Sequence, residues 1–72
     1  MITINQRTKQ IISLKNSRAF AIHDRLDDAG NIVKRRLSVT REDAGKYGLV
    51  EWLLINGFYF IARLNQYRLV IE

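Results

Sequence analysis

The strongest constraint on the fold is an alternating pattern on both sides of one turn. The segments Arg18 to Leu26 and Ile32 to Thr40 each alternate apolar with polar residues, which is the period of a half-buried strand. Between them, Asp27 to Asn31 consists mainly of residues that tolerate turn dihedrals. The pattern therefore predicts a β-hairpin with one apolar face and one polar face.

The polar face of this hairpin is basic. Alternation places His23 and Arg25 on that face of the first strand, and Lys34 and Arg36 on the same face of the second. Arg35 alternates onto the apolar face, although it belongs to the same run of cations. Arg18 lies next to the turn that precedes the first strand and adds one more cation. The candidate nucleic-acid contacts are therefore Arg18, Arg25, Lys34, Arg35 and Arg36.

A third strand is expected ahead of this hairpin. Gln10 to Leu14 has strand character, with Ile2 to Ile4 as an extension of it. The residues Lys15 to Ser17 favour a turn and separate this segment from the hairpin. The sequence thus predicts three strands in the N-terminal part of the chain.

A second hairpin is expected at the C-terminal end. Phe58 to Leu64 and Tyr67 to Glu72 flank the dipeptide Asn65-Gln66, which predicts two strands joined by a two-residue loop. In that register Arg63 lies opposite Arg68, which is an unfavourable pair of like charges.

A helix is expected between the two hairpins. Thr40 stands before Glu42 and Asp43, and this pattern starts a helix because the hydroxyl caps free N–H groups and the acids face the positive end of the helix dipole. The helix is expected to end at Asn56-Gly57, where glycine can take the left-handed conformation. The alternative is that Asn56-Gly57 forms a type I′ hairpin turn between two apolar strands. The capped start and the helix propensity of the leucines favour the helix.

These elements predict one α+β domain over residues 1–72, with a small antiparallel sheet (β-β-β-α-β-β) packed on one helix. The alternative is a mostly β fold with a short helix. A chain of 72 residues buries only about 60% of its unfolded surface, so the domain is marginal as a monomer. Because the chain has no cysteine, disulfides cannot compensate, and we expect a homodimer.

Catalytic and metal-binding chemistry find little support in this chain. A zinc site needs several Cys, His, Asp or Glu ligands at compatible spacing, and the chain has one histidine, His23, and no cysteine. Its neighbour Asp24 alternates to the other face of the strand and cannot orient the imidazole for acid-base chemistry. We therefore expect no enzymatic activity, no metal and no cofactor.

The segment Gly45-Lys46-Tyr47-Gly48 has the G-x-x-G form that clamps the nucleic-acid backbone in KH domains. That clamp needs a helix-loop-helix context, which the single expected helix does not provide. A closer approach of the helix to the sheet, or an irregular first turn, is the simpler explanation of the glycines.

The N-terminal residues indicate the compartment. They include Arg7 and Lys9 and lack the apolar core of a signal peptide, and no apolar run approaches the roughly 18 residues of a membrane-spanning helix. We expect a cytoplasmic protein with no membrane partner.

Two functions fit these features. The chain has 12 basic and 7 acidic residues, and the first hypothesis is a small non-enzymatic protein that binds nucleic acid, DNA in particular, through the basic hairpin face. The alternative is a protein-binding inhibitor or regulator module that docks on a partner, such as an acidic protein surface, through its aromatic or charged surface. For that role the candidate interface residues are Trp52, Tyr59 and Ile61.

Overall fold

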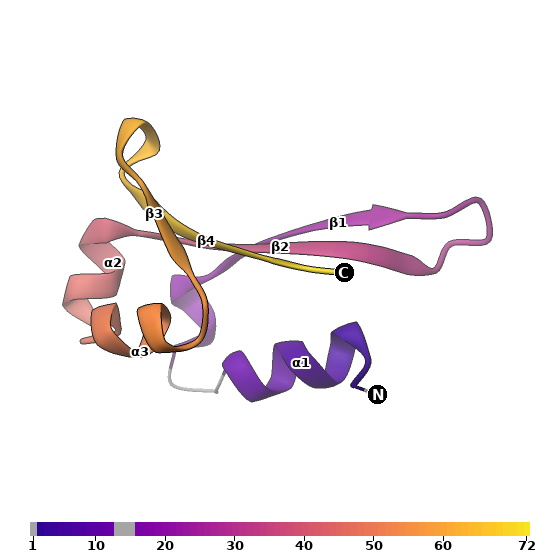
Figure 1. Ribbon diagram of the computed structural model, residues 1–72, viewed down its shortest axis with the longest axis horizontal. Coiled ribbons are helices and arrows are strands. Elements are labelled where there is room, and N and C mark those ends of the chain that lie inside the picture. Colours follow the sequence, from indigo (N-terminus) through magenta and orange to yellow (C-terminus); the bar gives the residue numbers. More distant parts are fainter. Residues whose placement is uncertain (1, 13–15) are drawn as a thin grey trace.

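Four antiparallel strands form one sheet in the computed structural model, which describes residues 2–12 and 16–72 (Figure 1). Their order across the sheet is β1-β2-β4-β3. The strands are β1 (Ala21–Leu26), β2 (Ile32–Thr40), β3 (Tyr59–Ile61) and β4 (Gln66–Ile71). The helices are α1 (Ile4–Ile11), α2 (Arg41–Lys46) and α3 (Val50–Ile55), with short 3-10 helices at Ser17–Ala19 and Ala62–Leu64. The predicted α+β class, with a small antiparallel sheet, is confirmed.

The first predicted hairpin is also confirmed. β1 and β2 pair antiparallel, with Arg25 opposite Lys34. The carboxylate of Asp27 holds the turn, because it accepts hydrogen bonds from two N–H groups of the turn at 2.9 and 2.8 Å. The first strand begins at Ala21 and not at Arg18, because residues 17–19 wind into a 3-10 helix.

The far end of this hairpin extends beyond the other two strands (Figure 1). Ile71, the last residue of β4, lies opposite Arg35. Residues 32–34 of β2 therefore pair with β1 alone, and the sheet narrows to a two-stranded arm at this end.

The core lies on one face of the sheet, which we call the inner face. Burial alternates along β2, where Leu37 and Val39 are 0% and 2% exposed, whereas Arg36 and Ser38 are only partly buried. Helices α1, α2 and α3 lie on this side of the strands in Figure 1. Ile11 from α1, Ala44 from α2 and Leu53 from α3 are buried in the same core. Removing this apolar surface from water is the main term that stabilises the fold.

The helix expected after Thr40 is present, but it is divided in two. The hydroxyl of Thr40 accepts a hydrogen bond from the N–H of Asp43 at 3.1 Å, as the capping pattern predicts. α2 ends before Gly48, whose φ of +65° is left-handed, and α3 ends in the same way before Gly57 with φ +91°. Asn56-Gly57 is thus a helix C-terminus, as predicted. The type I′ hairpin turn and the mostly β fold, which were the alternatives, are both excluded.

The N-terminal segment forms helix α1, so the third strand predicted over Gln10 to Leu14, with its extension at Ile2 to Ile4, is wrong. A capping box starts the helix: the N–H of Gln6 donates to Thr3 Oγ1 at 3.1 Å, and the N–H of Thr3 donates to Gln6 Oε1 at 2.9 Å. Residues 13–15, which include the end of that predicted strand and Lys15 of the predicted turn, lie outside the described residues. Partly or fully buried residues recur at a helical period, at Ile4, Arg7, Thr8 and Ile11.

The second hairpin forms with a different register from the predicted one. β3 ends at Ile61, residues 62–64 make a 3-10 helix, and Asn65 takes a left-handed φ of +53°. This longer loop replaces the predicted two-residue loop and places Tyr59 opposite Arg68. The observed register avoids the like-charge pair of Arg63 with Arg68 that the predicted register required.

Candidate nucleic-acid interface

The face of the sheet opposite the core, which we call the outer face, is not covered by a helix in the described part of the chain (Figure 1). The strand register determines which residues lie on it, because partners on antiparallel strands project to the same side. Ser38 alternates away from buried Leu37 and Val39, and it lies between Ala21 of β1 and Arg68 of β4. By the same reasoning the outer face contains Ala21, His23, Arg25, Lys34, Arg36, Ser38, Tyr59, Ile61, Arg68 and Val70.

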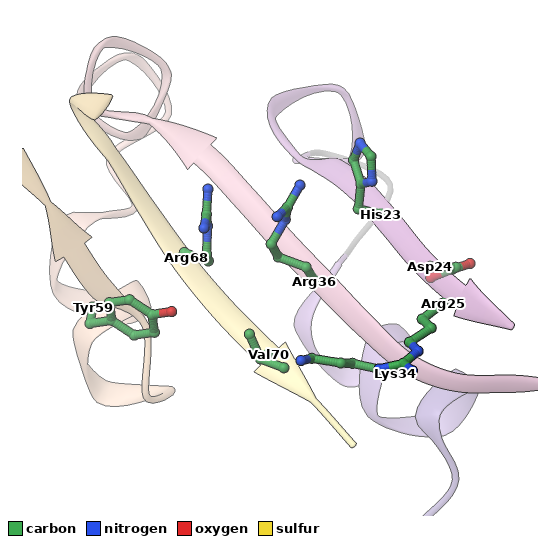
Figure 2. A pocket seen from close by; sticks show the side chains of 8 residues that line it. All are labelled: His23, Asp24, Arg25, Lys34, Arg36, Tyr59, Arg68 and Val70. Carbon is green, nitrogen blue, oxygen red and sulfur yellow. The ribbon is translucent and has the colours of Figure 1, made fainter. Parts of the chain in front are cut away.

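Four cationic side chains line one hollow in the outer face. Arg25 comes from β1, Lys34 and Arg36 come from β2, and Arg68 comes from β4. Figure 2 shows the guanidinium groups of Arg36 and Arg68 projecting in the same direction from neighbouring strands. Strand pairing brings these residues together, since neighbouring strands lie only about 5 Å apart. His23 lies beside them on β1 and lines the same hollow.

Acidic groups compensate little of this positive charge. Glu72 Oε1 lies 3.9 Å from Lys34 Nζ, and the two side chains are 72% and 45% exposed, so this surface ion pair is weak. Asp24 also lines the hollow, but its carboxylate is bonded to Arg35. Within residues 2–12 and 16–72, Arg25 and Arg36 have no hydrogen bond or ion pair through their side chains. Both arginines are therefore available to an anionic ligand.

Arg68 has part of its hydrogen-bonding capacity unused. Its Nη2 donates to Gln66 Oε1 at 3.2 Å, while its Nε is buried and has no hydrogen-bond partner among the described residues. A buried donor without a partner costs about 1–3 kcal/mol. Because Nε is buried, the terminal nitrogens of Arg68 are the ones that a ligand can reach. The planar guanidinium fork matches the oxygens of a phosphate or a carboxylate.

Arg35 lies on the inner face, apart from the other candidate residues. Its Nε and Nη2 donate to the two carboxylate oxygens of Asp24 at 2.7 and 3.0 Å. Its Nη1 donates to Asn5 Oδ1 at 3.1 Å and to Thr8 Oγ1 at 2.9 Å. The hydrogen bonds from Arg35 hold the pKa of Asp24 below its usual value, and the same bonds raise the pKa of Arg35. This arginine joins α1 to the hairpin and has little capacity left for a ligand.

Arg18 lies outside the hollow that holds the other cations. It belongs to the 3-10 helix before β1 and is exposed. It lines a second hollow together with Ser38, Thr40 and Asp43. Arg18 is thus a cation at the periphery of the outer face.

The three aromatic and apolar residues of the candidate protein interface do not lie together. Trp52 belongs to α3 and packs on the core, with 6.5 Å between its ring centroid and that of Phe58. Tyr59 and Ile61 lie on the outer face, on the other side of the sheet. The structure therefore separates Trp52 from Tyr59, and it places Tyr59 in the hollow with the cations (Figure 2).

The sequence did not identify Arg68 as a site residue. It also did not predict that Tyr59, a candidate for the protein interface, lies next to the cations. Both depend on the pairing of β4 with β2, which brings Arg68 opposite Ser38. That contact joins distant segments, and periodicity reports only which face of its own strand a residue occupies. The alternation of Tyr67, Arg68 and Leu69 was the available signal that Arg68 points away from the core.

The G-x-x-G segment lies at the junction of α2 and α3, so the helix-loop-helix context that the sequence did not predict is present. Its backbone donors, however, are already used within the fold. The N–H of Tyr47 donates to Asp43 O at 3.0 Å, that of Gly48 to Gly45 O at 3.2 Å and that of Leu49 to Ala44 O at 2.8 Å. These bonds end α2, and they leave none of the three N–H groups for a phosphate.

No family model, curated protein or solved structure matches this chain. In the described residues, no helix is both long and apolar enough to cross a membrane. The same part of the chain contains no group of three or more His, Cys, Asp or Glu side chains placed to hold a metal ion.

Proposed function

We propose that the protein binds nucleic acid, and that Arg25, Lys34, Arg36 and Arg68 of the outer face contact its phosphates. The observation that carries this proposal is the convergence of four cations from three strands on one open hollow. Of the two carboxylates there, Asp24 is bonded to Arg35 and Glu72 makes a weak, exposed ion pair with Lys34. Phosphate contacts of this kind supply affinity and orientation without reading sequence.

The chemistry of the hollow supports a phosphate ligand. The side chains of Arg25 and Arg36 have no hydrogen bond or ion pair within the described chain, and Nη2 is the terminal nitrogen of Arg68 that is hydrogen-bonded there. Each arginine offers a fork of N–H donors that binds two oxygens of one phosphate. The release of counterions from the polyanion adds a favourable term that depends on salt.

The test is a fluorescence-anisotropy titration against duplex DNA, single-stranded DNA and RNA at salt concentrations between about 50 and 200 mM. Four phosphate contacts predict a slope of log affinity against log salt of about −3 to −4. The variant Lys34→Glu/Arg36→Glu should reduce the magnitude of this slope by about two and weaken binding to every polynucleotide.

The matched control is Lys9→Glu/Lys46→Glu, which changes the net charge by the same amount at exposed positions of α1 and α2. It should bind much more tightly than Lys34→Glu/Arg36→Glu. Equal losses for the two variants would show that only net charge matters, and the proposed interface would then be wrong. Failure of all three polynucleotides to bind at low salt would refute the proposal and leave an acidic protein surface as the partner of the outer face.

Two predictions from the sequence accompany this proposal. A cytoplasmic location would bring the protein into contact with nucleic acid. A homodimer would present two outer faces to one strand, and light scattering coupled to size-exclusion chromatography measures that state directly.

A further inference from the structure

We infer that the nucleic acid bound by the outer face is single-stranded, and that one of its bases stacks on the ring of Tyr59. This inference rests on the proposed function and specifies the class of nucleic acid. A stacked base is an independent contact, because it does not depend on the charge of the phosphates.

The ring of Tyr59 is accessible. Tyr59 is 49% exposed, although it lies on a strand of the sheet. The aromatic pairs of the described chain, such as Phe20 with Phe58 at 5.9 Å between centroids, do not include it. Its side chain has no hydrogen bond within the same residues. The fold therefore leaves the face of this ring available to a ligand.

Tyr59 also lies at the end of the group of cations. Tyr59 on β3 is the strand partner of Arg68 on β4, and Arg36 lies on β2, the neighbour of β4 on its other side. Figure 2 shows the hydroxyl of Tyr59 directed toward β4. A backbone that contacts Arg36 and Arg68 therefore passes within about one strand spacing, ~5 Å, of the aromatic ring. One strand of nucleic acid can place its phosphates on the arginines and a base on Tyr59.

The width of the sheet argues against insertion of this row into the major groove of a duplex. The row Ala21-Ser38-Arg68-Tyr59 is four strands wide, which amounts to about 14 Å between the outer strand axes before side chains are added. The major groove of B-DNA is about 12 Å wide and admits a two-stranded ribbon. Arg68 and Tyr59 cannot enter that groove with the rest of their row. The bases of a duplex are, in addition, already stacked on one another, whereas the bases of a single strand are free to stack on an aromatic ring.

The test compares three variants, Tyr59→Ala, Tyr59→Phe and the control Tyr47→Ala. Tyr47 is 39% exposed at the end of α2 and is therefore a tyrosine of similar exposure outside the interface. Each protein is titrated with labelled oligouridylate and oligothymidylate of about ten nucleotides, and with a duplex of equal length. Tyr59→Ala should weaken binding to both single strands about tenfold and leave duplex binding unchanged. Tyr59→Phe, which keeps the ring, should bind like the wild type, as should Tyr47→Ala.

A second measurement does not depend on truncating the side chain. In Tyr59→Trp the introduced indole should stack on a base, and its fluorescence should be quenched when the oligouridylate binds. The wild type supplies the reference, because Trp52, its single tryptophan, lies on the inner side of the sheet.

The outcomes separate this inference from the proposed function. If Tyr59→Ala binds single strands as tightly as the wild type while Lys34→Glu/Arg36→Glu does not, the stacking inference is overturned and the phosphate interface stands. Tighter binding to the duplex than to either single strand at equal salt, or an unquenched indole in Tyr59→Trp, also overturns it. If no polynucleotide binds the wild type, both the inference and the proposed function are refuted.

Discussion

Arg35 and Arg36 are adjacent in the sequence and differ in almost every structural property. Arg35 is 9% exposed and donates four hydrogen bonds, to Asp24, Asn5 and Thr8. Arg36 projects from the opposite face of β2 and has no partner in the described chain. The comparison shows that strand alternation, and not membership of a cationic run, decides which arginine stabilises the fold and which is available to a ligand.

The two faces of the sheet differ in the same way as the two arginines. On the inner face, Leu37, Val39 and Tyr67 are buried in the core, and Arg35 is satisfied by hydrogen bonds. On the outer face, four cations lie close to one another with little compensation, which is a repulsive arrangement in the absence of an anion. Stability and binding should therefore respond to separate substitutions.

The largest expected effect is on stability, from Arg35→Gln. This change leaves the carboxylate of Asp24 and the oxygens of Asn5 and Thr8 without their donor, and it should cost about 2–3 kcal/mol of unfolding free energy. The thermal midpoint, followed by circular dichroism, should fall by on the order of 10 °C. Arg36→Gln should stay within about 0.5 kcal/mol of the wild type. Equal losses for both variants would contradict the contrast between the two faces.

The next effect is the reciprocal one, on binding. Arg36→Gln should reduce affinity for single-stranded nucleic acid several-fold and lower the magnitude of the salt slope by about one. Arg35→Gln, measured well below its own thermal midpoint, should keep the wild-type salt slope because Arg35 lies on the inner face. An unchanged slope for Arg36→Gln would remove Arg36 from the interface.

Local patterns in the sequence were sufficient for several parts of the fold. Alternation predicted the first hairpin and the outward direction of Lys34 and Arg36, and Thr40 and Gly57 predicted one helix start and one helix end. The N-terminal helix was missed, although its capping box, Thr3 with Gln6, is visible in the sequence. Short apolar runs do not distinguish a strand from a buried turn of helix, and that ambiguity led to the wrong strand.

The rest of the site depends on contacts that no local pattern contains. Arg68 and Tyr59 join the cations through the pairing of β4 with β2 and through the register of the second hairpin. A left-handed Asn65 and the 3-10 helix before it set that register. The sequence is also compatible with a two-residue loop at Asn65-Gln66, and that loop predicts a different, incorrect register. The burial of Arg35 was implied by alternation, yet its partners on α1 followed only from the position of that helix.

A smaller effect is expected from two glycines on the helical side of the molecule. Gly48 has a left-handed φ of +65°, so Gly48→Ala should destabilise the fold by about 1 kcal/mol. Gly45 lies within α2 with open space around its Cα, so Gly45→Ala should stabilise the fold by about 0.5–1 kcal/mol. Urea unfolding measures both, and neither variant should change affinity for nucleic acid. A change in affinity would show that the helical side takes part in binding.

The smallest effect is the dependence of stability on pH that arises from the ion pair of Asp24 with Arg35. Because the pKa of Asp24 is lowered in the folded state, chiefly by the hydrogen bonds from Arg35, the unfolded chain takes up this proton first as the pH falls. The stabilisation is thus complete above the ordinary aspartate pKa of about 4, and it is lost as the pH falls through the lower folded value.

Asp24→Asn removes this titration, so the difference in unfolding free energy between the wild type and Asp24→Asn should be constant near neutrality and shrink below about pH 4. The pKa of Asp27 is lowered as well, mainly by its hydrogen bond with the Asn31 N–H, but that carboxylate is present in both proteins and its contribution cancels. Urea unfolding of both proteins at neutral pH and at several acidic pH values measures the difference. A gap that stays constant into strong acid would mean that the inner-face ion pair does not stabilise the fold through the charge of Asp24. Binding at neutral pH should not follow this titration, because Asp24 stays ionised there and its carboxylate is bonded to Arg35.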